Sequence, residues 1–228
     1  MARLPRLALA GCAHYVRQTC VQGHLLTVDA EDERSLLAAL RELSAQHRVA
    51  IWAYALLTHE LQLVLCPETA AGLGRFMQAL GRRYVQAFNR RHARQGALWA
   101  GRYRAAIVED GEWLLASILR VDVLSRQTGR PGSAAHHAGE HRDPVLREPP
   151  ALWSLGNTPF ERELEWRRRL DAGLEPALDA ALARGIHGAW AVGSAVFIAR
   201  VANALGRPAA PRRAGRPRRA LPSEHVPN

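Results

Sequence analysis

The sequence contains no lysine, because all 31 of its basic residues are arginine. Against 21 acidic residues they leave a net charge of +10. Arginine pairs bidentately with phosphate and stacks on bases, so this surplus favours a polyanionic partner such as DNA. An anionic membrane is the weaker alternative, since the basic stretches lack a clean amphipathic segment. Abundant Ala and Arg without Lys also reflect a GC-rich genome.

Long hydrophobic runs and paired cysteines are also lacking. No stretch approaches the roughly 18 apolar residues that a membrane helix needs, so we expect no membrane span. The three cysteines have no CxxC spacing, which favours buried small side chains over a disulfide framework or a zinc site. The apolar run LALAGCA is only seven residues long, at the lower limit for a signal peptide, so we expect a cytoplasmic protein.

Hydrophobic periodicity predicts the order strand, helix, strand, strand, helix, strand, helix in the first 125 residues. Asp29 is the expected N-cap of the first helix. The order indicates an α+β fold with a ferredoxin-like split β-α-β arrangement, one antiparallel sheet and helices on one face. The predicted strands cover 13–20, 49–57, 60–66 and 104–110, and the helices 29–46, 70–93 and 112–125.

Composition divides the chain into a domain at 1–126, a Gly-, Pro- and His-rich flexible linker at 127–150, a helical region at 151–206 and a disordered Arg-rich tail at 207–228. Three short helices in the third segment indicate either a small bundle, conceivably of helix-turn-helix type, or a packing extension. Gly185 is the expected stop of the middle helix. A metal at His136, His137 and His141 is the minor alternative to solvated imidazoles.

Arginines flank the apolar stripe of the second helix and continue into the loop after it. A run of one sign favours phosphate contact over a merely solvated face. Trp99 and Tyr103 are candidates for stacking on unpaired bases, with core packing as the alternative for Trp99. Arg216 and Arg218 in the tail suit a narrow minor groove or general phosphate attraction. The candidate phosphate contacts are Arg82, Arg83, Arg90, Arg91, Arg102 and Arg104.

Several segments together resemble the REP-associated tyrosine transposases, a group of the single-tyrosine HUH transposases of bacterial insertion sequences. They are MARLPRL, AHYV, AIWAYALLT…LVLCP and, above all, FMQALGRRYVQAFNRRHARQGALWAGRYRAAIVED. The resemblance covers about residues 1–125 and continues in GTPFERE, AWAVGSAVFIARV and GRPRR. It implies an HUH transposase-like domain that binds and cleaves REP-type hairpins in single-stranded DNA.

The chemistry implied by this resemblance needs a His-hydrophobe-His pair on one strand, which holds Mg²⁺ or Mn²⁺. It also needs a tyrosine on the last helix that attacks the phosphate, and a Gln or Asn one turn later. Aligned without gaps, the two histidine positions become Glu60 and Gln62. A slip of one residue puts His59 at the first position but Leu61 at the second. The tyrosine position becomes Arg120, and the later amide becomes Leu124.

These departures predict a copy that has lost strand transfer. Arginine stays protonated and is no phosphodiester nucleophile. We expect Glu60, Gln62 and Arg120 to be relics, paired as a salt bridge across the old pocket. The alternatives are a metal-dependent DNA endonuclease in which Glu60 and Gln62 still hold Mg²⁺ or Mn²⁺, and a decaying product without selected function. The expected partner is single-stranded or hairpin DNA, bound by a monomer.

Overall fold

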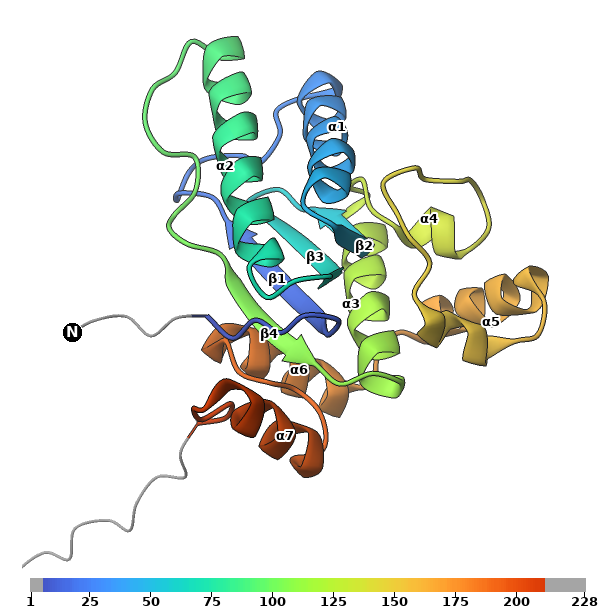
Figure 1. Cartoon of the computed structure of the whole chain (residues 1–228). Helices are drawn as coiled ribbons and strands as arrows, with labels where there is room; N and C mark the ends of the chain where they lie inside the picture. The colour runs from blue at the N-terminus through green and yellow to red at the C-terminus, as the bar shows by residue number, and fades with distance from the viewer. Residues whose placement is uncertain (1–5, 212–228) are drawn as a thin grey trace, which may run out of the picture.

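A four-stranded antiparallel sheet forms the centre of the computed structural model, which describes residues 6–211 (Figure 1). The strand order is β2-β3-β1-β4. Helix α1 joins β1 to β2 with β3 between them, and α2 joins β3 to β4 with β1 between them, which confirms the predicted split β-α-β topology. The strands are β1 (Ala13–Thr19), β2 (Val49–Leu56), β3 (Glu60–Pro67) and β4 (Arg104–Val108).

Strand β3 shows how the sheet is covered on both faces. Leu61, Leu63 and Leu65 pack in one core with α1 (Ala30–Gln46) and α2 (Gly72–Arg91). Val64 belongs to a second core on the opposite face, with α3 (Glu112–Thr128). Residues that alternate along a strand point to opposite faces, so a strand with apolar residues at both sets of positions needs two layers of helix. The expectation of helices on one face is therefore wrong.

The two helices of the first face begin and pack as their sequences predict. The Asp29 side chain caps α1 by accepting hydrogen bonds from the backbone N–H groups of Glu31 and Asp32. Leu36 and Leu40 of α1 are fully buried in the first core. Helix α2 adds an apolar stripe at Leu73, Phe76, Met77, Leu80, Tyr84 and Phe88, and its arginines lie off this stripe.

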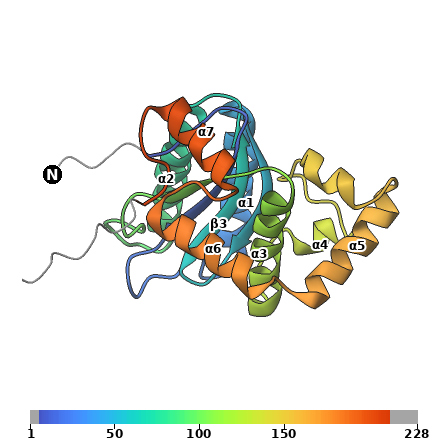
Figure 2. The same ribbon diagram turned by 90° about the horizontal axis from the view of Figure 1, so that it is seen from below.

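The second face is covered by α3 and by the chain that follows it (Figure 2). Helix α3 ends at Gly129, whose left-handed backbone (φ 61°) is the conformation in which glycine is favoured. Helix α5 packs on α3, whereas α6 packs on β4, β1 and α3. These helices therefore extend the domain instead of forming a bundle of their own. The later elements are α4 (Ala134–His137), the 3-10 helix η1 (Pro150–Leu155), α5 (Pro159–Ala172), α6 (Pro176–Gly188) and α7 (Ala195–Leu205).

Gly185 does not stop α6, which continues to Gly188. A Cβ atom at Gly185 would lie 2.0 Å from Val192 Cγ2 and 4.0 Å from Ala106 Cβ, so glycine is required for α6 to approach the sheet. Val192 in turn pairs with β4, since its N–H donates to Ile107 O and its carbonyl accepts from Glu109 N. The chain after α6 thus covers the edge strand of the sheet.

A buried carboxylate joins α3 to the region expected to be a flexible linker. Asp122 is fully buried and accepts hydrogen bonds from Ser133 Oγ (2.5 Å), His137 Nδ1 (2.7 Å) and Trp166 Nε1 (2.9 Å). Ser133 Oγ also accepts from the backbone N–H of Tyr54 in β2. Residues 130–146 are therefore packed against the sheet, which differs from the expected linker.

No helix within residues 6–211 combines the length and apolar character that a membrane crossing requires.

Removing this carboxylate will leave two buried donors, His137 Nδ1 and Trp166 Nε1, without an acceptor, whereas the Ser133 hydroxyl keeps Tyr54 O. We expect Asp122→Ala to lower the free energy of unfolding by about 3–5 kcal/mol, the cost of breaking a buried, hydrogen-bonded pair. The matched control is Asp171→Ala, since the Asp171–Arg126 pair joins two largely exposed side chains and should change stability by less than about 1 kcal/mol. Urea unfolding followed by circular dichroism measures both. Equal effects of the two substitutions would contradict the role given to Asp122.

His14 in β1 makes stability depend on pH. It is fully buried, its Nδ1 lies 2.8 Å from Cys12 O, and its Nε2 accepts from Leu9 N–H, so only the neutral imidazole satisfies both contacts. Burial lowers its pKa from 6.5 to about 4. Between these values the unfolded chain binds a proton that the folded chain does not, so stability falls as the pH drops from 6.5 towards 4.

From pH 7 to pH 5 this linkage corresponds to about 2 kcal/mol. We expect the wild-type protein to lose about that much more stability over this interval than His14→Gln, which has no titrating group at this position. Urea unfolding of both proteins at the two pH values checks the difference. A pH dependence shared equally by the two proteins rules out His14 as its source.

Candidate nucleic-acid interface and the catalytic positions

Glu60 and Gln62 lie on the same face of β3, as the alternation predicts, and both are held by protein contacts. Arg17 of β1 places its Nε 2.5 Å from Glu60 Oε2. The Gln62 amide donates to Glu60 Oε1, and Gln62 Oε1 accepts from the hydroxyl of Tyr15. Arg17 and Gln62 are directly opposite each other in the β1–β3 register, which brings these side chains together.

Arg120 lies on α3 beside the same cluster but pairs with a different carboxylate. Its Nη1 donates to Asp179 Oδ1 of α6. The expected salt bridge between Glu60 and Arg120 is therefore wrong: Glu60 pairs with Arg17, and Arg120 pairs across the α3–α6 contact. The Nε atom of Arg120 is buried and has no hydrogen-bond partner within residues 6–211.

Glu60 and Gln62, which the sequence resemblance aligns with two metal ligands, do not fit a divalent ion in this structure. The Glu60 carboxylate already meets the Arg17 guanidinium and the Gln62 amide, and the Gln62 oxygen already accepts from Tyr15. Leu124 is apolar and supplies no third ligand. Across the described part of the chain, no three His, Cys, Asp or Glu side chains are grouped as a metal site. That also applies to His136, His137 and His141, where His137 is bound to Asp122.

Tyr15 is a residue of this cluster that sequence reasoning missed. It is fully buried, and burial is the main cause that raises the pKa of its phenol. A buried phenol that is protonated and donates to Gln62 is poorly suited to attack a phosphate. The signal that could have located it is its position in β1, two residues before Arg17 and on the same strand face.

Four arginines of α2 were expected to contact phosphates, and the structure divides them into two pairs. Arg82 and Arg90 are exposed, and no carboxylate in the described residues forms an ion pair with either. Arg83 is paired with Glu42 at 2.5 Å, and Arg91 reaches Asp29 (2.6 Å) and the buried Asp32 (2.8 Å). Only the first pair presents guanidinium groups that no carboxylate occupies.

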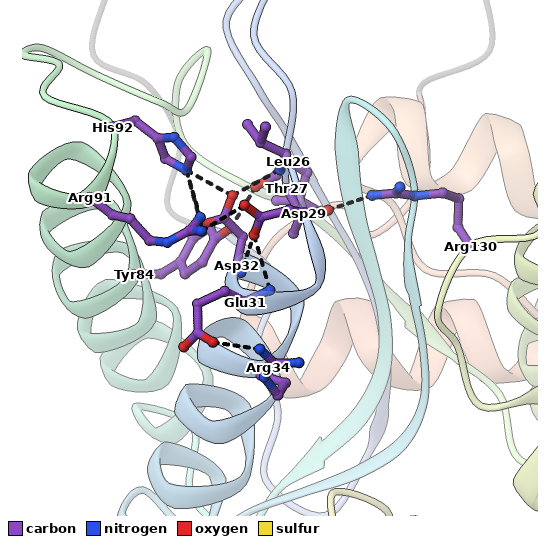
Figure 3. A network of polar contacts seen from close by, with 11 residues as sticks. Leu26, Thr27, Asp29, Glu31, Asp32, Arg34, Tyr84, Arg91, His92 and Arg130 are labelled. Atoms are coloured by element: carbon purple, nitrogen blue, oxygen red, sulfur yellow. Dashed lines mark hydrogen bonds and ion pairs between the residues drawn. The ribbon is translucent and has the colours of Figure 1, made fainter.

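Arg91 belongs to a polar network between the start of α1 and the end of α2 (Figure 3). His92 Nε2 lies 2.9 Å from Asp32 Oδ2, and the Tyr84 hydroxyl donates to Leu26 O. The hydrogen bond from Arg91 lowers the pKa of Asp29 to about 2. These contacts hold the two helices together, so Arg91 has a structural role that its sequence position did not indicate.

The loop after α2 brings the remaining candidates to the edge of the sheet. Trp99 packs against α2, with its ring centroid 6.3 Å from that of Tyr84. This position agrees with core packing, the alternative to base stacking. Tyr103 lies under the guanidinium of Arg6, whose Cζ is 3.8 Å from the ring centroid. Arg102 is exposed, and Arg104 donates to the backbone carbonyl of His187. Arg216 and Arg218 lie outside the described residues.

Comparison with solved structures finds the same fold in a REP-associated tyrosine transposase bound to a REP hairpin. The match has a TM-score of 0.51 and 10% sequence identity, and covers 66% of this chain and 93% of that one. At this identity the likeness establishes the fold, and about a third of the present chain lies outside the match. No protein-family model matches the chain. No curated protein matches it either.

The Arg120–Asp179 pair gives a test of how α6 is held against α3. The Arg120 side chain is 18% exposed, so Asp179→Ala leaves a partly buried charge without a partner. We expect a loss of about 1–2 kcal/mol in the free energy of unfolding. Arg120→Met in the same background should recover most of it, because it removes the unpaired charge. A double variant that is less stable than Asp179→Ala would contradict this account.

Proposed function

We propose that this chain binds single-stranded or hairpin DNA and does not form a phosphotyrosine intermediate. The observation that carries the proposal is that Arg120, Glu60 and Gln62, the positions that the sequence resemblance aligns with catalytic residues, are held in structural contacts. Exposed arginines elsewhere, Arg82 and Arg90 among them, have no carboxylate partner in residues 6–211. The shared fold with a hairpin-bound transposase supports DNA as the partner. Arg82 and Arg90 are the first proposed contacts.

The resemblance in sequence also carries the finer parts of the proposal. It assigns the chain to the REP-associated tyrosine transposases of bacteria, as a cytoplasmic monomer that has kept the binding surface. The residues themselves support the proposed loss of strand transfer. Arg120 cannot act as a nucleophile, and Tyr15 is buried beneath α6, whose Leu182 and Ile186 share its core. Binding through guanidinium groups alone needs no metal.

The wild-type protein tests this proposal directly. We expect a labelled REP-type hairpin to shift on a native gel without divalent metal, and the shift to weaken steeply as salt rises. With Mn²⁺ present, we expect neither a cut strand nor a covalent adduct on a denaturing gel. A covalent adduct would overturn the claim of lost chemistry, cleavage that disappears in Glu60→Ala would favour the nuclease, and absence of any shift would overturn binding.

Arg82→Ala combined with Arg90→Ala tests the surface. Each lost contact with a single strand should reduce the slope of log K against log salt by about 0.7, so the double variant should bind more weakly and lose about 1.4 from the slope. Arg34→Ala combined with Arg168→Ala is the matched control, since these helical arginines are exposed and the net charge changes equally. Equal losses in the two double variants would show that only net charge matters.

A further inference from the structure

An arginine-lined cavity lies where the C-terminal region meets the edge of the sheet. Its volume is about 600 Å³, and it is bounded by the N-terminal segment, β1, the loop before β4, the end of α6 and the chain after α7. No Asp or Glu of the described residues lines it. Its five arginines are Arg6, Arg17, Arg102, Arg104 and Arg207.

Four of these guanidinium groups keep their charge uncompensated. Arg17 is paired with Glu60, but no ion pair joins the other four to a carboxylate anywhere in residues 6–211. Burial lowers the pKa of Arg6, and the nearby charge of Arg102 acts in the same direction. Like charges gathered without counter-charges repel one another, and a bound anion relieves this repulsion; guanidinium groups also match the geometry of phosphate oxygens.

Contacts between the segments hold the cavity in shape. Arg6 Nε donates to Tyr103 O (2.9 Å), Gln18 Nε2 donates to Gly101 O (3.0 Å), and Arg104 donates to His187 O. The walls are therefore set before any ligand arrives, which lowers the entropy cost of binding.

Two aromatic side chains complete the lining. Tyr103 carries Arg6 on one side of its ring. Trp190 lies two residues after the end of α6. A Cβ atom at Gly188 would lie 2.1 Å from the Trp190 indole, so only glycine at this position leaves room for the ring. Aromatic side chains beside guanidinium groups suit a single DNA strand, because its unpaired bases can stack on the rings and its phosphates can pair with the positive charges.

We propose that this cavity binds the phosphates and a base of an unpaired DNA strand next to a hairpin, with the C-terminal region forming one of its walls. The inference rests on the proposed DNA binding and adds a second site to the α2 surface. It also gives a function to a part of the chain, from His187 to Arg207, that sequence reasoning considered only as a helical extension or bundle.

Two hairpins with the same stem and loop test the cavity, one blunt and one with an unpaired 5′ extension of six nucleotides. We expect Arg102→Ala combined with Arg207→Ala to bind the extended hairpin about tenfold more weakly and to reduce its salt slope by about 1.4. Binding to the blunt hairpin should change less than about twofold. Fluorescence anisotropy with a label in the hairpin loop measures both. Arg102→Lys combined with Arg207→Lys should recover part of the affinity.

Different failures have different meanings in this experiment. If wild-type protein binds neither hairpin, the proposed function fails as well as the cavity. If it binds both, and Arg82→Ala with Arg90→Ala weakens both while the cavity variant weakens neither, only the cavity proposal fails. An equal loss on blunt and extended hairpins would also overturn it, because the arginines would then contact the duplex. Gly188→Ala, which keeps the charge but displaces Trp190, should weaken the extended hairpin without changing the salt slope.

Discussion

The sheet has apolar residues on both of its faces, and the rest of the structure depends on covering them. Helices α1 and α2 bury Leu61, Leu63 and Leu65, but the opposite face, with Tyr15 and Val64, needs an equal layer. Helix α3 covers only part of it. The C-terminal chain supplies the remainder, with Leu182 and Ile186 of α6 in the same core as Tyr15. Since hydrophobic burial is the main favourable term in folding, the C-terminal region belongs to the domain and is no appendage.

This layer of helix lies over the face of the sheet that carries Tyr15, Glu60 and Gln62. The polar groups left beneath it cannot remain without partners in a dry interior. Gln62 accepts from Tyr15, Glu60 meets Arg17, and Arg120 reaches Asp179 at the side of α6. Each of these side chains thereby has a neighbour that stabilises the fold, although the Nε atom of Arg120 stays without a hydrogen-bond partner in the described residues. A substitution at one of these positions would break its pair and leave the partner unsatisfied, so changes in this cluster are coupled.

A contact could be predicted from the sequence when its two residues lie close together along the chain, and could not when they lie far apart. The Asp29 cap and the alternation of Glu60 with Gln62 are local patterns, and both were predicted. The partners of Glu60, Arg120 and Asp122 come from segments 43 to 59 residues away or from the supposed linker, where no periodicity is visible. The Gly-, Pro- and His-rich composition of residues 127–150 predicted a flexible linker. Composition does not reveal that Ser133 and His137 bind the buried carboxylate of Asp122.

The same limit applies to the charge. A net charge of +10 favours a polyanion but does not say which arginines are available to it. Arg83 and Arg91 sit in the most basic run of the sequence, yet carboxylates of α1 and its cap bind both. Arg6, Arg17 and Arg207 are far apart from one another in sequence and gather at one cavity only because β1 lies beside β4 and the C-terminal chain returns to that edge. Among the described residues, the carboxylates therefore matter as much as the arginines for the proposed DNA binding, since they decide which guanidinium groups remain unpaired.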